Sequence, residues 1–486
     1  MLPSAHRSAF GQFLTPADVA AFMASLLKCR HQHVRLLDPG AGTGSLTVAA
    51  IEHLLGLKNP PQSVHIVCFE VEDAFLPFLT ENLNLCAQHA GEHGVNLTYE
   101  IRRQDFLEAA VQLLECAVFG LPAAEQFHLC ILNPPYKKIA AASRQRTWIR
   151  AIGFETVNLY TGFLGAAAAL LCEGGELAGI TPRSFCNGPY YKDFRRFFFE
   201  RMSLQRLHIF ESRDKAFKED DVLQETLITH ARKCATRGKV RISSSLTPNG
   251  QNQNTMLLPH DSVVIPEDKE QFIRLLSSKE EVNHSIRMDR FNHTLSQLDI
   301  GVSTGRVVDF RSKNHLIMQP ESDTVPLIYP VHFTDWTISW PAPSGKKSNA
   351  IRALPETASM LLPPGYFVLT KRFSAKEEAR RVVAVVYEGK KIFDGPVAFE
   401  NHLNYFHHGH HGLEADLAWG LAAYLNSGMV DSFFRTFNGH TQVNATDLRA
   451  LHYPSALELS KLGLFARTHR PSAAELDCFL LELAGH

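Results

Sequence analysis

The sequence predicts an α/β protein in which a doubly wound, mainly parallel sheet is followed by an α+β domain. Apolar runs in the first half each end near a polar side chain, and stretches with helical spacing lie between them. That alternation is typical of parallel strands covered by helices. After about residue 243 the pattern changes to short β-rich runs and then to helices.

The composition fits a folded protein that works inside a cell. Hydrophobic residues make up 45% of the 486 residues and charged residues 20%, which excludes a mainly disordered chain. No apolar run reaches the roughly 18 residues of a membrane-spanning helix, and the first residues lack an apolar signal core. The nine cysteines form no CxxC pair, which indicates reduced thiols. We therefore expect a cytoplasmic protein with no membrane partner.

The first half is expected to hold strands at 34–38, 64–70 and 127–132, each ending at or just before a residue with a side-chain oxygen. A helix should precede them, because apolar side chains recur at helical spacing before the first strand. Thr15 is expected to cap that helix, with Pro16 as its first residue. In a doubly wound sheet ligands bind outside the carboxyl ends of the strands, so a site is expected there.

A glycine-rich loop follows the first predicted strand, in the segment LLDPGAGTGSL. Asp38 ends the strand, and Gly40, Gly42 and Gly44 precede a helix. Glycine lets backbone approach a ligand closely and adopt positive φ. The spacing is GxGxG, not the dinucleotide GxGxxG. An acid before the loop would repel a pyrophosphate but suits a cationic ligand, such as the ammonium and sulfonium of S-adenosylmethionine. The alternative is a tight turn of any α/β protein.

Acids at the next two strand ends are candidate ligands of the same molecule. Glu70 ends the second predicted strand, where a carboxylate can accept both hydroxyls of a ribose. Asp105 and Phe106 follow a third predicted strand and could bind an adenine amino group and stack on its ring. The alternatives are a solvated acid for Glu70 and a helix N-cap for Asp105.

The segment Asn133-Pro134-Pro135-Tyr136 carries the most specific chemistry. An exocyclic amino nitrogen conjugated to a ring is a poor nucleophile. The Asn133 side-chain oxygen and the Pro134 carbonyl could accept its hydrogens and draw the nitrogen towards sp³ geometry. Consecutive prolines fix φ and remove competing donors. Tyr136 offers a ring face on which a flipped base can stack. An Asn-Pro-Pro turn without function is the alternative, and the strand order disfavours it.

Together these segments resemble the motifs of S-adenosylmethionine-dependent amino methyltransferases. LLDPGAGTG, FEVE, QDF and NPPY look like motifs I to IV, and FGQFLTPADVAAFM, which lies before them, looks like motif X. That order resembles the gamma class of DNA adenine-N6 methyltransferases of bacterial type II restriction-modification systems. The resemblance covers residues 8–235 and implies a Rossmann-like methyltransferase fold, followed by a target-recognition domain.

The resemblance also implies roles for the matching residues. Contacts with S-adenosylmethionine are expected from Thr15, Pro16, Asp38, Gly40, Gly42, Glu70, Asp105 and Phe106. Asn133, Pro134 and Tyr136 are the expected catalytic residues, acting on N6 of a flipped adenine in duplex DNA. Phe217 is expected to flank the base from the other side, with a core position as the alternative. Methyl transfer of this kind needs no metal.

A basic segment follows the NPPY turn. Lys137, Lys138, Arg144 and Arg146 lie in a stretch without acids, and we expect a mobile loop there whose cations contact DNA phosphates. A solvated loop is the alternative. The net charge of −1 requires that DNA binding depend on such local patches. The four histidines of FHHGHHG are interpreted as a polar loop rather than a zinc site, since no cysteine is near.

The domains are expected at 1–262, the catalytic methyltransferase domain, and 263–486, the DNA target-recognition domain. No nuclease motif is evident, so a cognate restriction endonuclease would be a separate chain. The motifs leave alternatives open: methylation of cytosine N4, of guanine N2 in ribosomal RNA or of glutamine in a protein, or a non-catalytic DNA-binding subunit of a defence system. Enzymes that act on RNA or protein are typically shorter, and those that act on cytosine usually have Ser in place of Asn133.

Overall fold

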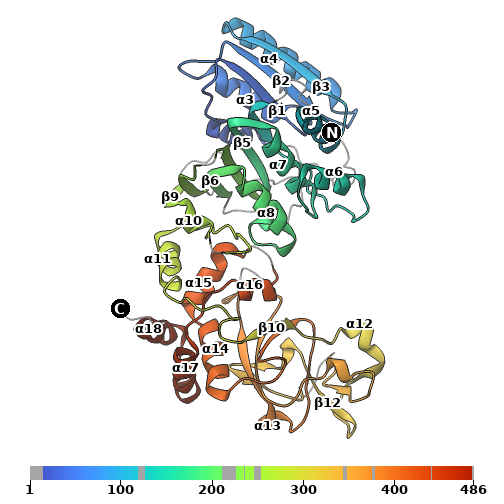
Figure 1. Cartoon of the computed structure of the whole chain (residues 1–486), viewed down its shortest axis with the longest axis vertical. Coiled ribbons are helices and arrows are strands. Elements are labelled where there is room, and N and C mark those ends of the chain that lie inside the picture. The colour runs from blue at the N-terminus through green and yellow to red at the C-terminus, as the bar shows by residue number, and fades with distance from the viewer. Residues whose placement is uncertain are drawn as a thin grey trace. The chain divides into compact units, whose positions relative to one another are not determined.

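In the computed structural model the chain forms two compact units, Met1–Ser278 and Lys279–His486 (Figure 1). The structure describes residues 15–118, 126–210, 226–234, 236–245, 253–266, 268–342, 347–374, 378–438 and 441–483. The sequence predicts a domain boundary after residue 262, whereas the first compact unit of the structure extends to Ser278. The extension has a physical reason, because the backbone N–H of Ile273 donates to Cys186 and that of Arg274 to Val263, at 2.9 and 2.8 Å.

The first unit is built on a nine-stranded sheet with the order β3-β2-β1-β4-β5-β7-β6-β8-β9. Its strands are β1 His33–Asp38, β2 Ser63–Phe69, β3 Asn96–Arg102, β4 Phe127–Leu132, β5 Leu171–Pro182, β6 Met202–Phe210, β7 Thr226–Lys233, β8 Lys239–Ser245 and β9 Asn254–Pro259. The first five strands in this order run parallel. β7 then lies antiparallel between β5 and β6. The predicted doubly wound, mainly parallel sheet is therefore confirmed.

Helices pack against this sheet. They are α2 Ala17–Leu26, α3 Ser45–Leu55, α4 Leu76–Glu92, α5 Phe106–Val118, α6 Arg144–Ile152, α7 Leu159–Leu170, α8 Lys192–Phe199 and α10 His260–Val263. The predicted apolar face of α2 is buried together with β1, β2 and β4 in one core cluster. β2 and β3 lie on one side of β1 and β4 lies on the other. The chain order therefore reverses between β1 and β4, which opens a crevice at their carboxyl ends.

The second unit confirms the α+β expectation. Its helices are α11 Lys279–Met288, α12 Asp309–Ser312, α13 Gly389–Ile392, α14 Ala415–Leu425, α15 Gly428–Phe437, α16 Ala445–Arg449, α17 Ala456–His469 and α18 Ala473–Leu483. One sheet has the order β10-β19-β16-β17, from Gly301–Thr304, Leu403–His407, Tyr366–Lys371 and Ala384–Glu388. Another has the order β11-β15-β12-β18, from Leu316–Ile317, Ala350–Arg352, Thr324–Ile328 and Ala398–Phe399. β13 Phe333–Thr334 pairs with β14 Thr337–Ile338.

Two glycines allow the helices α14 and α17 to cross closely. A Cβ on Gly420 would lie 1.7 Å from the carbonyl oxygen of Leu459, and one on Gly463 would lie 1.8 Å from that of Asp416. Any larger side chain at either position would force the helices apart. Within the described ranges, no helix combines the length and the hydropathy needed to cross a membrane.

Candidate functional site

The carboxyl ends of the parallel strands bring the predicted site residues to one edge of the sheet. A cavity of about 280 Å³ opens there. It is lined by Pro39, Gly40, Phe69, Glu70, Val71, Gln104, Asp105, Phe106, Pro135, Lys137, Gln145, Leu159 and Phe163. The segments after β1, β2, β3 and β4 all contribute, as the strand order requires. Asp38, Gly42 and Asn133 lie beside this lining rather than in it.

Asp38 is fully buried at the end of β1. Its Oδ2 accepts a hydrogen bond of 2.7 Å from the hydroxyl of Thr47 in the first turn of α3. Its Oδ1 has no hydrogen-bond partner among the described residues. Burial raises the pKa of the Asp38 carboxyl to about 7, in spite of the Thr47 hydroxyl and the backbone N–H of Gly40, which lower it. A buried acceptor without a partner is costly, so this oxygen suits a cationic or hydrogen-bond-donating ligand.

The loop after Asp38 requires glycine and is joined to Glu70. Gly44 adopts φ +89°, and a Cβ there would lie 2.9 Å from Leu79 Cδ1, so both backbone and packing demand glycine. The N–H of Gly42 donates to Glu70 Oε2 at 2.7 Å. Glu70 Oε1 accepts from the N–H groups of Val71 and Glu72, both at 2.8 Å. These bonds fix the buried Glu70 carboxylate at the cavity wall.

Asp105 directly precedes α5, Phe106 is the first residue of that helix, and both line the cavity. Asp105 Oδ1 accepts from the N–H of Leu107 at 2.9 Å, which is a helix-capping bond, and Oδ2 accepts from Gln145 Nε2 at 3.3 Å. Phe106 is 1% exposed, and its ring packs against Phe69 and Phe163. Burial raises the pKa of Asp105. Asp105 thus both caps the helix and lines the cavity.

The NPPY turn is held by hydrogen bonds at its two ends. The Asn133 Nδ2 group donates to Thr15 Oγ1 at 3.0 Å, and the hydroxyl of Tyr136 donates to Asn133 Oδ1 at 3.0 Å. The same hydroxyl reaches the carbonyl of Ile180 at 3.3 Å. Pro134 is buried. The Asn133 amide is therefore fixed in orientation, with its oxygen towards Tyr136.

The expectation that Thr15 caps the first helix is wrong. The N-cap of α2 is Pro16, and no side chain caps it. The Thr15 hydroxyl bonds Asn133 instead, across 118 residues of sequence. Thr15 and Pro16 thus place the start of α2 against the NPPY turn, and Gly40 lies against it too, since its Cβ position is 4.0 Å from the Asn133 carbonyl oxygen.

The bond between Tyr136 and Asn133 makes a testable prediction. On the catalytic role that the resemblance implies for Asn133, Tyr136→Phe should lower the turnover of methyl transfer only about two- to tenfold, because one neutral hydrogen bond that orients Asn133 is lost while the ring remains. Tyr136→Ala should in addition lose roughly 1–3 kcal/mol of base binding, because the stacking surface disappears. Burial raises the pKa of Tyr136, so the hydroxyl remains a donor at neutral pH. Steady-state kinetics of both variants on DNA check this, and equal damage from Phe and Ala would contradict a stacking role.

The basic segment after the NPPY turn is partly helical rather than a mobile loop. Arg144 begins α6 and is exposed, as are Lys137 and Lys138. Arg146 donates from Nε to Glu155 Oε2 at 2.6 Å, an ion pair with an acid just beyond the acid-free stretch. Helix formation follows from the Ser143 side chain, which accepts a bond from the N–H of Arg146. Arg146 is therefore occupied within this unit. Phe217 lies outside the described residues.

Sequence reasoning missed three residues that complete the site. Thr47 bonds Asp38, while Gln145 and Phe163 line the cavity beside Asp105 and Phe106. Gln145 stands among the basic residues and Phe163 within an apolar helix, so neither carries a sequence signal of its own. Among the residues that the structure describes, no group of three or more His, Cys, Asp or Glu side chains is placed to hold a metal ion.

The strand order, the acidic glycine loop and the NPPY turn at the switch point define a Rossmann-like methyltransferase fold. A family model, the Eco57I restriction-modification methylase, matches residues 54–217. The chain belongs to the type II methyltransferases of restriction-modification systems. It is 40% identical to type II methyltransferase M.PstI of Providencia stuartii over 458 residues, which are 94% of this chain and 89% of that one.

Further comparisons agree with this family. The chain is 40% identical to type II methyltransferase M.BsuBI of Bacillus subtilis over 482 residues, which cover 98% of this chain and 94% of that one. Among solved structures it resembles the type IIL restriction-modification enzyme MmeI in complex with DNA, with a TM-score of 0.57 and 12% identity. That match covers 96% of this chain and 71% of MmeI, and it concerns the fold.

Proposed function

We propose that this protein is a site-specific DNA methyltransferase that moves the methyl group of S-adenosylmethionine to N6 of a flipped adenine in duplex DNA. The observation that carries the proposal is the Asn133 amide, held by Thr15 and Tyr136 at the end of β4 beside the glycine loop. Two findings support DNA as the substrate: the chain belongs to the type II methyltransferases, and its fold resembles that of MmeI, which was solved in complex with DNA. The gamma-class order of motifs supports adenine over cytosine.

The residues present fit S-adenosylmethionine. The unpartnered Oδ1 of Asp38 is a buried acceptor next to the glycine loop, and the cavity beside it is walled by Glu70, Asp105 and Phe106. We assign the positively charged methionine end to Asp38 and Thr15, the ribose to Glu70, and the adenine to Asp105 and Phe106. Pro16, Gly40 and Gly42 would let the start of α2 and the glycine loop lie close to the cofactor. When bound, the cofactor supplies an activated methyl group.

The chain itself would bind and polarise the base. Asn133 Oδ1 and the carbonyl of Pro134 accept the two hydrogens of the amino group, so that its lone pair localises on nitrogen. For this, the Tyr136 hydroxyl must share or release Asn133 Oδ1, which it holds at 3.0 Å. The Tyr136 ring stacks on one face of the base, and Phe217 is proposed for the other. The proposed contacts with DNA phosphates are Lys137, Lys138 and Arg144. Arg146 would join them only after its ion pair with Glu155 breaks.

The two units are proposed to divide the work. The first carries every proposed chemical residue, and the second, from Lys279, would select the DNA sequence. Because the substrate is DNA, we place the enzyme in the bacterial cytoplasm, together with a cognate restriction endonuclease encoded as a separate chain.

A transfer assay tests the proposal. The purified chain should move tritium from methyl-labelled S-adenosylmethionine to duplex DNA, and a chelator should leave the rate unchanged because methyl transfer needs no metal. Asn133→Ala provides the matched inactive control. Label that appears only on RNA or on protein would overturn the proposal and favour one of the other amino-group substrates.

A further inference from the structure

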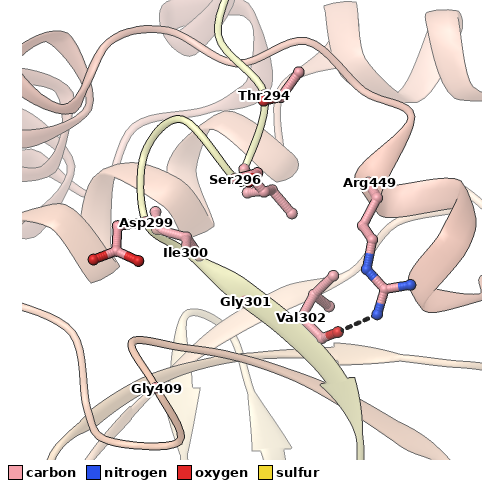
Figure 2. Close-up of a pocket in the computed structure, with 9 residues that line it drawn as sticks. Thr294, Ser296, Asp299, Ile300, Gly301, Val302, Gly409 and Arg449 are labelled. Atoms are coloured by element: carbon pink, nitrogen blue, oxygen red, sulfur yellow. Dashed lines mark hydrogen bonds between the residues drawn. The ribbon is translucent and has the colours of Figure 1, made fainter. Parts of the chain in front are cut away.

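The second unit contains a surface cavity of about 360 Å³ that the proposed chemistry does not use. Figure 2 shows its walls, which come from three parts of the sequence: the loop from Thr294 to Val302, the turn at Gly409, and Arg449 at the end of α16. Segments far apart in the chain thus converge on one hollow, and all of them belong to the unit Lys279–His486.

The first wall is held in shape by its own backbone. The carbonyl of Thr294 accepts from the N–H groups of Gln297 and Leu298, and the N–H of Ile300 donates to Leu295 at 2.9 Å. Next, β10 begins at Gly301, where a Cβ would lie 2.3 Å from Cε1 of His407. Only glycine lets the strand lie on that ring, so the position of the wall depends on close packing rather than on a flexible loop.

A second part of the wall is a tight turn. His408 and His411 exchange backbone hydrogen bonds of 3.0 and 2.7 Å, and the residues between them, Gly409 and His410, adopt φ +52° and +67°. Two successive residues with positive φ are typical of a type I′ hairpin turn. The cavity is therefore formed between two preorganised backbone segments, which reduces the ordering cost of binding.

Three side chains of the lining carry hydrogen-bond donors: Thr294, Ser296 and Arg449. The exposed Arg449 donates from Nη2 to the carbonyl of Val302 at 2.7 Å, which fixes a guanidinium that has five donors in all. Thr294 and Ser296 also line the hollow, although the Thr294 hydroxyl donates to Gln297 Oε1 at 3.1 Å. The acid of the lining, Asp299, projects away from Arg449 in Figure 2 and pairs with His408 at 3.3 Å.

A second guanidinium strengthens the positive field. Burial lowers the pKa of His407 most, and His410, Arg306, Arg449 and His408 lower it further. Together these effects hold the pKa of His407 at about 4, so the ring is neutral at neutral pH. The positive charge at this face therefore comes from the arginines, whose charge does not depend on pH in the physiological range.

We propose that this cavity binds a phosphate group of the DNA backbone, with Arg449 as its principal donor. The proposal rests on the proposed function, since it takes duplex DNA as the substrate. Arginine, hydroxyl and backbone N–H donors are the groups that contact DNA phosphates, and such contacts set the position of a protein on the duplex without reading its sequence. The recognition unit would be anchored here, while base-reading residues lie elsewhere.

The test measures the affinity of the full-length protein for a fluorescent random-sequence duplex by anisotropy, over a series of salt concentrations. Arg449→Gln removes the proposed donor, and Ser296→Asp places a negative charge in the cavity without removing the bond to Val302. Arg467→Gln is the matched control, because Arg467 is an arginine of the same unit that pairs with Asp416. Thermal melting verifies that every variant is folded.

We expect Arg449→Gln to weaken binding about fivefold at roughly 0.15 M salt and to reduce the slope of log affinity against log salt by about one, the value for one lost phosphate contact. Ser296→Asp should weaken binding at least as much, and Arg467→Gln should change neither quantity. Wild-type affinity in both cavity variants would overturn this proposal alone. Failure of the wild-type protein to bind any duplex would overturn the proposed function as well.

Discussion

Replacing Asn133 with alanine is expected to lower the turnover of methyl transfer by about 10²–10³-fold, the range for one preorganised polar group that acts on the transition state. The affinity for S-adenosylmethionine should change little. The physical reason is that, in the proposed mechanism, Asn133 Oδ1 accepts a hydrogen of the amino group, and this contact strengthens only as the nitrogen rehybridises. Single-turnover kinetics together with cofactor titration separate the two quantities.

The control for this variant is Asn59→Ala, which removes the same side chain from an exposed position between α3 and β2. It should leave both quantities unchanged. Asn133→Ala also removes the partner of Thr15 Oγ1, so a small loss of cofactor affinity is compatible with the account. Normal turnover combined with a large loss of cofactor affinity would contradict the role given to Asn133.

Asp38→Asn should show the reverse phenotype. A hydrogen bond to a charged group contributes about 1.5–3 kcal/mol, so the dissociation constant of S-adenosylmethionine should rise roughly 10- to 100-fold. At saturating cofactor, turnover should be close to that of the wild type. Isothermal titration and initial rates at high cofactor concentration measure both effects, and unaltered cofactor affinity would refute the assignment of Asp38.

The pKa of Asp38 also predicts how this variant affects stability. Burial raises that pKa to about 7 in the folded protein, from an ordinary value of 3.8. The folded state therefore binds this proton more tightly than the unfolded chain does. The stabilising contribution is present below the ordinary value and is lost as the pH rises towards about 7.

At pH 8 and without cofactor, the melting temperature of Asp38→Asn should consequently equal or exceed that of the wild type. The variant buries no charge, and its amide oxygen can still accept from Thr47. In the wild type, cofactor affinity should fall as the pH drops below about 7, because the carboxylate becomes protonated. A pH-independent affinity over this range would show that Asp38 does not bind the cation.

The strand ends could be predicted because short-range patterns determine them. Apolar runs fix β1, β2 and β4, and the residues that follow a parallel strand must reach the same edge of the sheet. Asp38, Glu70 and Asn133 could therefore be grouped from the amino-acid pattern alone. The glycine loop was predictable for the same reason. Gly42 and Gly44 adopt positive φ, a conformation that favours glycine, and glycines are visible in the sequence.

Contacts between distant segments could not be predicted in this way. The hydrogen bond from Asn133 to Thr15 joins residues 118 positions apart, and no pattern in the sequence predicts it. The ion pair between Arg146 and Glu155 depends on where α6 ends, so the basic segment looked free of acids in the sequence. The cavity of the second unit was still less predictable, because it is assembled from segments near residues 300, 409 and 449.

The identity of the methylated base tests the central claim most directly. Plasmid DNA from cells that express the full-length protein is digested to nucleosides and analysed by mass spectrometry, with cells that express Asn133→Ala as the control. The account predicts N6-methyladenine well above the control, with N4-methylcytosine at the control level. N4-methylcytosine without N6-methyladenine, or no difference between the two proteins, would contradict it.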